Sequence, residues 1–413
     1  MRDLLTKLSK ARYPYEPLIA IEISRNKLLH NLTEFQKLAP NHSIAPVLKS
    51  NAYGHGLIEI AKVIEHERNH ATAVDKESIP FLVVDSYFEA ISLRSHGIKT
   101  PILIIGYTPP ETIVRAKLKN ISFTITSLDA LRHLSELETP SWYKDFASGR
   151  IAFRMPFYPR KHRIHLKIDT GMRRQGILPS EIPVAIEILK SDGLLLLEGI
   201  ASHLCDADNS DEAFTEKQIA CWNKTVKQFK SVFPSLKYVH LSNTDGHRYS
   251  SETDANVSRL GIGLYGLIDG KTFQPELELK PIMQMKTILT SIKQLNAGET
   301  IGYSNTFRAE KNMTVATIPV GYYEGIDRRL SNAGTVLVGP ERVPCPIIGR
   351  VSMNIASIDV SRVAGPKIGM EAVVISNKPE DVNSAFNIAK TSGTITYEVT
   401  TKIPAHLKRV VVG

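Results

Sequence analysis

The sequence has few of the residues that would point to a membrane span, a disulfide scaffold or a metal site. Its 413 residues include only three cysteines, Cys205, Cys221 and Cys345, which form no CxxC pair. An odd and scattered set disfavours a disulfide framework and a zinc site, and is typical of reduced thiols. No stretch approaches the roughly 18 consecutive apolar residues of a membrane span, and the N-terminus has no apolar signal core. We therefore expect a cytoplasmic protein without a metal site.

The sequence also lacks a nucleic-acid-binding signature, although its formal net charge is +9. The 51 lysines and arginines are scattered among 42 acidic residues, whereas a nucleic-acid-binding surface would concentrate them. A diffuse positive field instead favours small anionic ligands. We expect neither a nucleic acid nor a membrane as a partner.

What the sequence does contain is a regular alternation of strand-like and helix-like segments over its first two-thirds. Amphipathic segments lie between most of the β-branched runs, for example 57–67, 88–97 and 211–233. Strand–helix alternation favours a parallel sheet, and eight repeats favour an α/β fold with a (β/α)8 barrel of the TIM type. The last connection, 244–258, has room for only a turn or two of helix. The eight predicted strands are 44–50, 81–87, 101–106, 122–127, 163–169, 194–204, 238–243 and 259–267.

The rhythm changes after about residue 280, where short β-type runs alternate with Gly, Pro and Asn. This pattern predicts a separate, mostly antiparallel β domain. The only convincing helix in this part lies near 380–390. We therefore expect a barrel domain over 1–280 and a C-terminal β domain over 281–413.

Several chemically capable residues stand where the predicted barrel strands end, which is where such barrels place their active sites. Lys49 ends the first predicted strand, His203 ends the sixth, and Arg259 opens the eighth, followed by Gly261 and Gly263. Cations combined with glycine-rich turns would suit an anionic, ring-bearing ligand.

Six sequence motifs follow one another along the chain. They are PVLKSNAYGHG (46–56), HLKIDTGMRRQG (165–176), RLGIGLYG (259–266), GETIGYSNTF (298–307), IPVGYYEG (318–325) and GRVSMN (349–354). Together they resemble the alanine racemases, pyridoxal 5′-phosphate (PLP) enzymes with a barrel domain and a β domain. One motif alone would be moderately specific, but six in the family's order are highly specific.

The resemblance implies a pair of catalytic residues. Lys49 is similar to the family's cofactor-binding lysine. A lysine is needed there because a primary amine condenses reversibly with an aldehyde and can then act as a base at the substrate Cα. Tyr303 is similar to the second base, which serves the active site of the partner subunit in a homodimer. A free phenol has a pKa of about 10, so a neighbouring cation would help, and His203 is the candidate neighbour.

Arg259 is similar to the family's partner of the cofactor's pyridine nitrogen. An arginine offers only donors and stays charged, so it leaves that nitrogen unprotonated. The resemblance implies that quick reprotonation at Cα is then favoured over transamination. A salt-bridged arginine at the barrel mouth is the alternative. His240 is a candidate to orient this side chain.

Other ligand contacts follow from the same resemblance. Arg174 is similar to the arginine that contacts the cofactor's phenolic oxygen and the substrate. Lys167 matches a lysine that is carbamylated in many relatives, and an unmodified lysine paired with Asp169 is the alternative. The residues implied for the phosphate are Tyr53, Thr244, Gly261 and Ile262, and those implied for the substrate from the β domain are Met353 and Tyr322. Gly261 could equally be a glycine required by packing.

The chain also departs from the family pattern. Asn354 stands where the family commonly has Asp, and residues 323–326 alter a segment that usually reads GYADGY. Counting from Tyr397, Ala405 takes the place of a tyrosine that contacts the phosphate in some members. These changes remove no catalytic group, but they affect the expected width of the substrate pocket.

The resemblance implies a PLP-dependent racemase that interconverts L- and D-alanine and supplies D-alanine for peptidoglycan. A racemase of broader or different preference, for serine or basic amino acids, is the nearest alternative. The β domain disfavours a non-enzymatic PLP carrier. Arg259 disfavours a decarboxylase, which would normally have a carboxylate at that place.

Overall fold

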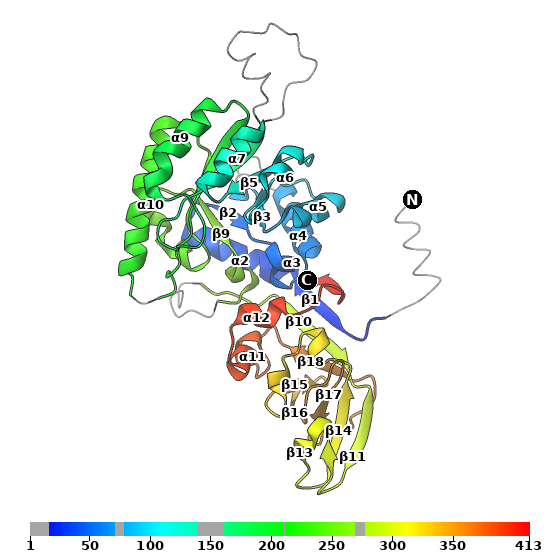
Figure 1. Ribbon diagram of the computed structural model, residues 1–413. Helices are drawn as coiled ribbons and strands as arrows, with labels where there is room; N and C mark the ends of the chain where they lie inside the picture. The colour runs from blue at the N-terminus through cyan, green and yellow to red at the C-terminus, as the bar shows by residue number, and fades with distance from the viewer. Residues whose placement is uncertain (1–15, 71–77, 139–160, 210, 269–276) are drawn as a thin grey trace, which may run out of the picture. The chain divides into compact units, whose positions relative to one another are not determined.

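The computed structural model of the chain describes residues 16–70, 78–138, 161–209, 211–268 and 277–413 (Figure 1). These residues fall into two compact units. The barrel unit comprises Leu28–Leu279, and the β unit comprises the described residues up to Lys27 together with Lys280–Gly413. This division differs from the expected ranges, 1–280 and 281–413, because a strand near the N-terminus pairs within the β unit.

Parallel strands form the centre of the barrel unit, and each of them overlaps one of the eight strands predicted from the sequence. Strands β3 to β8 pair in chain order as one six-stranded sheet, and β2 pairs with β9. A bridge between Val47 and Val83 links β2 to β3, and the Arg259 N–H donates to the Ser242 carbonyl beyond β8. The predicted barrel fold is confirmed. In the described part of this unit the strands are β2 (Ser43–Pro46), β3 (Leu82–Val84), β4 (Ile102–Ile104), β5 (Ile121–Ile125), β6 (His162–Lys167), β7 (Leu195–Ala201), β8 (Tyr238–His240) and β9 (Val257–Leu260).

Helices follow most of these strands, and their sequences explain where they form. Helix α5 begins with a capping box in which Ser86 and Glu89 satisfy each other's backbone N–H groups. Buried residues recur along α10 at intervals of three or four, including Ile219, Trp222 and Val226, as expected for a helix packed on a sheet. The helices are α2 (Arg25–Leu38), α3 (Lys49–Tyr53), α4 (Leu57–His70), α5 (Tyr87–Ser95), α6 (Pro110–Arg115), α7 (Leu128–Glu138), α9 (Ile182–Ser191) and α10 (Ala213–Val232), with 3-10 turns η2 (Pro179–Glu181), η3 (Asp245–Glu252) and η4 (Ile262–Tyr265).

A mostly antiparallel sheet dominates the β unit. Among the described residues its nine strands are ordered β11-β14-β17-β16-β15-β18-β10-β1-β19. Strand β1 (Ala20–Ser24) lies between β10, to which it is antiparallel, and β19, to which it is parallel. The others are β10 (Met283–Ile288), β11 (Ser291–Leu295), β14 (Met313–Ile318), β15 (Thr335–Val338), β16 (Val343–Ile348), β17 (Ala356–Asp359), β18 (Glu371–Ile375) and β19 (Arg409–Val412), and a separate pair is formed by β12 (Thr300–Ile301) and β13 (Phe307–Arg308).

From residue 277 onward, the β unit contains two α-helices where the sequence predicted one. Helix α11 (Ala385–Ser392) lies at the predicted place, and α12 (Thr396–Thr401) follows it. The sequence TYEVTT of α12 is rich in β-branched residues, which lower helix propensity. Contacts with the rest of the unit therefore have to stabilise it.

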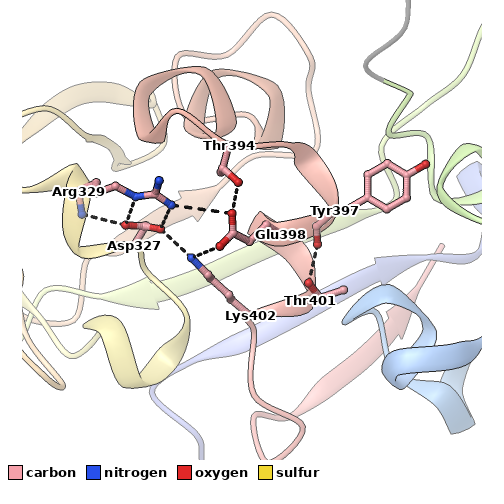
Figure 2. Close-up of polar contacts among 7 residues, drawn as sticks. All are labelled: Asp327, Arg329, Thr394, Tyr397, Glu398, Thr401 and Lys402. Carbon is pink, nitrogen blue, oxygen red and sulfur yellow. Dashed lines mark hydrogen bonds and ion pairs between the residues drawn. The ribbon is translucent and has the colours of Figure 1, made fainter. Parts of the chain in front are cut away.

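A cluster of ion pairs supplies such contacts (Figure 2). Asp327 accepts hydrogen bonds from Arg329 at 2.7 Å and from Lys402 at 2.9 Å. Glu398 of α12 lies 2.8 Å from the Lys402 ammonium group. The hydrogen bond from Arg329, followed by that from Lys402, holds the pKa of Asp327 below its ordinary value. The cluster joins α12 to the segment that follows Gly325.

Two further observations concern the described residues of both units. None of their helices is long and apolar enough to cross a membrane. No group of three or more His, Cys, Asp or Glu side chains among them could hold a metal ion.

Candidate active site

Lys49 lies at the carboxyl end of β2, but it is separated from the strand. The strand ends at Pro46, three residues earlier than Lys49, which itself begins α3. The next four residues all have positive φ angles: 56° for Ser50, 55° for Asn51, 52° for Ala52 and 53° for Tyr53. They wind as a left-handed turn, which costs on the order of 1–2 kcal/mol per non-glycine residue. Such strain persists only where surrounding contacts hold it.

Polar contacts from neighbouring elements hold this left-handed turn. The Ser50 N–H donates to Glu89 Oε1 at 2.8 Å, and the Leu57 N–H donates to Asn51 Oδ1 at 2.9 Å. Glu89 also closes the capping box of α5, so one carboxylate orders both the helix and the turn. The backbone that carries the half-buried Lys49 side chain is thereby fixed.

Arg259 is buried in β9, and the atoms that accept its hydrogen bonds among the described residues are all uncharged. They are His240 Nδ1 at 2.7 Å, the His240 carbonyl at 2.8 Å, the Ser202 carbonyl at 2.6 Å, the Leu241 carbonyl at 3.1 Å and His203 Nδ1 at 3.2 Å. Burial lowers the pKa of Arg259 to about 10, with Tyr53 opposing the shift, so it remains a cation at neutral pH. The geometry agrees with an arginine oriented by His240 and does not support the salt-bridge alternative.

His203 differs from its expected role as a cation. Burial holds its pKa well below the ordinary value, and the charges of Arg259, Lys167, Arg174 and Lys49 lower it further. The ring is therefore neutral at pH 7. This histidine therefore does not supply the positive charge that the sequence led us to expect beside a tyrosine base.

Thr244 and the turn after β9 form a small cradle. Thr244 Oγ1 accepts the N–H groups of Gly261 at 3.2 Å and Gly263 at 3.3 Å, which leaves its hydroxyl hydrogen as a donor. A Cβ atom at Gly261 would lie 2.4 Å from the Tyr53 hydroxyl oxygen, so a side chain there would displace that hydroxyl. Burial raises the pKa of Tyr53 to about 12, so the phenol keeps its proton. Hydroxyl donors and the backbone turn at Ile262 suit a phosphate.

The cradle belongs to a turn and not to a strand. The predicted strand 259–267 ends at Leu260, and the residues that follow form η4. This shortening matters because residues of a turn can direct backbone N–H groups toward a ligand, whereas those of an inner strand pair with neighbouring strands.

The charges around Lys167 are mainly positive. Its pKa is lowered to about 8, first by burial and then by Arg259, Arg174 and Lys49, while Asp169 acts in the opposite direction. Asp169 Oδ1 accepts two backbone N–H groups of the turn that follows it. Arg174 itself is exposed. Excess positive charge at the mouth of a barrel favours an anionic ligand, and the donor set fits a phosphate-bearing group.

The three residues expected from the β domain lie on neighbouring loops of the β unit. Their exposed fractions are 70% for Tyr303, 55% for Met353 and 44% for Tyr322. The Tyr322 N–H donates to the carbonyl of the residue before Met353 at 3.0 Å. A Cβ atom at Gly302, which precedes Tyr303, would lie 3.4 Å from the Arg350 nitrogen. Large exposed side chains gathered on adjacent loops are typical of a surface that binds another molecule.

Two family descriptions match the chain over most of its length: "Alanine racemase, N-terminal domain" over residues 23–269 and "Alanine racemase, C-terminal domain" over residues 282–411. The chain belongs to the alanine racemase family. The family resemblance of the six motifs is thus confirmed, and with it the expectation of an enzyme that is an amino-acid isomerase.

Relatives of known name and structure are similar over nearly the whole chain. The alanine racemase of Carboxydothermus hydrogenoformans is 33% identical over 393 residues, which is 95% of this chain and 98% of that protein. The structure of an alanine racemase from Clostridium difficile 630 has a TM-score of 0.82 at 29% identity and covers 96% of each chain. That of an alanine racemase from Bacillus anthracis with bound L-Ala-P has a TM-score of 0.81 at 27% identity, covering 97% of this chain and 96% of that one.

Asn354, which departs from the racemase pattern, has a partner that explains it. Its Nδ2 atom donates to Glu324 Oε1 at 2.7 Å, and Glu324 Oε2 accepts the Gly321 N–H at 2.8 Å. Glu324 also departs from the pattern and is only 6% exposed. An amide supplies the donor that this buried carboxylate needs, whereas a second carboxylate would repel it. Asn354 and Glu324 therefore form a matched donor–acceptor pair beside Met353.

Some features of the site were not predicted from the sequence. Glu89 has a signal, because Ser86 and Glu89 have the spacing of a capping box, but nothing in it indicates contact with Ser50. His165 has none, since it lies within an ordinary run of buried strand residues. Ala405 is exposed, and the expected loss of one phosphate contact there stays a prediction.

Proposed function

We propose that this protein is a PLP-dependent racemase that interconverts L- and D-alanine. The observation that carries the proposal is Arg259, a buried guanidinium held by carbonyls and neutral imidazoles at the same end of the barrel as Lys49. A decarboxylase would normally have a carboxylate in place of this arginine. The relatives described above are alanine racemases, which supports alanine as the substrate.

The donor set of the barrel unit supports PLP as the cofactor. When bound, PLP supplies an electron sink that acidifies the Cα–H bond of an amino acid. Lys49 would provide the amine for its aldehyde, and Arg259 would provide a donor for its pyridine nitrogen. Arg174 would contact the phenolic oxygen of the cofactor and the substrate. His203 would lie beside Arg259 in the cofactor site. The residues that would hold the phosphate are Tyr53, Thr244, Gly261 and Ile262.

Proton transfer at the substrate Cα is assigned to two residues. The Lys49 amine removes or returns the proton on one face, and the Tyr303 hydroxyl does so on the other. The 70% exposure of Tyr303 in the β unit supports a role in the active site of a partner subunit of a homodimer. Met353 and Tyr322, on adjacent loops, would contact the substrate carboxylate and line the entrance of that same site.

Mixed dimers test this arrangement. Lys49→Ala and Tyr303→Phe should each abolish most activity, the second by about 10²–10⁴-fold, the usual contribution of a general acid or base. If each site takes its lysine from one subunit and its tyrosine from the other, a mixed dimer has one intact site. Random assembly of the two co-expressed variants should then restore about a quarter of wild-type activity. No restoration would refute sharing between subunits, and full activity of Tyr303→Phe would refute the second base.

The cofactor assignment has an independent readout. The purified protein should be yellow, and borohydride should fix a reduced adduct on the peptide that contains Lys49, identified by mass spectrometry. Lys49→Ala should give no adduct. A colourless protein that gains no colour with added PLP would contradict the assignment.

A racemase of broader specificity remains the second candidate, because residues 323–326 and Ala405 alter the expected pocket. A panel of L-amino acids, assayed for the D-isomer, separates the two. Equal turnover of lysine and alanine would refute the assignment of alanine as the preferred substrate. A role in supplying D-alanine for peptidoglycan predicts that the gene rescues a bacterium that requires D-alanine for growth, and that the Lys49→Ala variant does not.

A further inference from the structure

Behind Arg259 lies a chain of hydrogen bonds that ends at a residue without an assigned role. Arg259 Nη1 lies 2.7 Å from His240 Nδ1, and His240 Nε2 lies 2.7 Å from His165 Nδ1. His240 and His165 are 0% and 1% exposed. The Nε2 atom of His165 is buried and has no hydrogen-bond partner among the described residues.

Elementary hydrogen-bond chemistry fixes every proton in this chain. A guanidinium has only N–H donors, so His240 Nδ1 has to be the acceptor and carry no proton. A neutral imidazole then carries its proton on Nε2, which donates to His165 Nδ1. His165 Nδ1 is therefore an acceptor, and its proton is on Nε2. A charged form of either ring would place two donors against each other.

Both rings are neutral on electrostatic grounds as well. Burial lowers the pKa of His165 to about 3, with a further contribution from Arg259. Burial also holds the pKa of His240 well below its ordinary value, and Arg259 adds to the effect. The neutral tautomers are thus the stable forms across the whole physiological pH range.

The barrel is built around the His165 ring. The pairing of β6 with β7 shifts register between Ile164 and His165. A Cβ atom at Gly199, on the neighbouring strand, would lie 2.7 Å from His165 Nδ1, so a side chain there would displace the ring. Tyr238 stacks on the ring with centroids 5.7 Å apart, and Phe81 meets it edge-on at 5.6 Å. A bulge, a glycine and two aromatic rings thus fix one orientation.

We propose that His165 is a positioning residue for Arg259. By accepting the His240 Nε2 proton, it keeps His240 Nδ1 unprotonated and so available to the guanidinium. Without that acceptor, the buried Nε2–H of His240 would lack a partner, and the proton could move to Nδ1, where it would oppose the Arg259 donor. The unpartnered Nε2–H of His165 destabilises the fold, but the same ring orientation fixes the Arg259 guanidinium. The effect on racemisation rests on the proposed function, whereas the tautomers do not.

Nitrogen-15 NMR of the protein labelled at histidine tests the proposal directly. In the wild type, both His240 and His165 should show an unprotonated Nδ1 and a protonated Nε2, unchanged between pH 6 and pH 9. A proton on His240 Nδ1 in the wild type would overturn the proposal without any substitution.

Two variants at one position separate hydrogen bonding from packing. His165→Leu fills the site without an acceptor, and His165→Asn keeps an oxygen near the place of Nδ1. His165→Leu should alter the His240 nitrogen shifts and lower kcat roughly tenfold, as expected for a buried donor that loses its acceptor. His165→Asn should restore both. Unchanged His240 shifts in His165→Leu would overturn the proposal. Altered shifts in a protein that racemises nothing would instead point to failure of the proposed function.

Discussion

Replacing Ala52 by glycine tests whether the left-handed turn after Lys49 is strained. Ala52 has a φ of 52° and is 0% exposed. Glycine adopts this backbone conformation without steric cost, so the substitution removes whatever penalty the alanine carries. Ala61 lies in the right-handed helix α4 and is equally buried. Ala61→Gly is therefore a matched control, because it removes the same methyl group and relieves no strain.

The magnitudes follow from three contributions. Loss of a buried methyl group removes roughly 0.8 kcal/mol of hydrophobic stabilisation, and the greater freedom of glycine costs roughly 0.5–1 kcal/mol. Ala61→Gly should therefore lower the free energy of unfolding by about 1.5 kcal/mol. In Ala52→Gly, relief of about 1–2 kcal/mol of backbone strain offsets these losses. This variant should lie within about 1 kcal/mol of the wild type.

Chemical denaturation followed by far-UV circular dichroism compares the two variants. Protein and cofactor concentrations have to be equal, because binding and association shift apparent stability. Because two units need not unfold together, the comparison uses the transition in which the barrel helices are lost. If both variants lost the same free energy, or if Ala52→Gly lost more, the turn would not be strained in the way the φ angles indicate.

Three further changes have definite expected results. Asn354→Asp should lower the free energy of unfolding at pH 7 by about 1–3 kcal/mol, because Glu324 would lose its donor and face a second carboxylate; urea denaturation measures the loss, and an unchanged midpoint would contradict this. Asp327→Asn should cost roughly 1 kcal/mol at pH 7, since the ion pairs are partly exposed. The pKa of Asp327 is lowered in the folded state, so this stabilisation is present above its unfolded pKa of about 4 and is lost as the pH falls toward the folded value; the denaturation midpoints of wild type and variant should converge in acid. Lys167, with its pKa of about 8, should react with trinitrobenzenesulfonate with a midpoint near pH 8 in the cofactor-free protein, as measured by peptide mapping; a midpoint above pH 10 would show that burial and the neighbouring cations do not act on it.

The barrel strands could be read from the sequence because both faces of a parallel barrel are covered. Strands β3 and β4 are buried at every position, so their β-branched, apolar composition alone marks them. The end of β2 could not be read in the same way. Nothing in the residues after Lys49 signals a left-handed turn, which depends on hydrogen bonds to Glu89 and Leu57, both supplied by other parts of the chain.

The candidate site shows the same division. Lys49 and Arg259 could be found because they lie within sequence motifs. The neutral state of His203 could not, since it results from burial and from charges brought together by folding. Helix α12 was missed for a related reason: its own residues disfavour a helix, and Glu398 stabilises it through partners outside the helix.

The position of β1 in the sheet has a consequence for how the chain folds during synthesis. Its two partners, β10 and β19, both follow the whole barrel unit in the chain and are therefore made after it. The barrel can fold as a unit as soon as it has emerged from the ribosome, but β1, at its amino end, has no partner strand until β10 is synthesised. The barrel is in effect an insertion between β1 and β10 of the β unit. A fragment that ends before β10 would carry an open strand edge, and such edges promote aggregation.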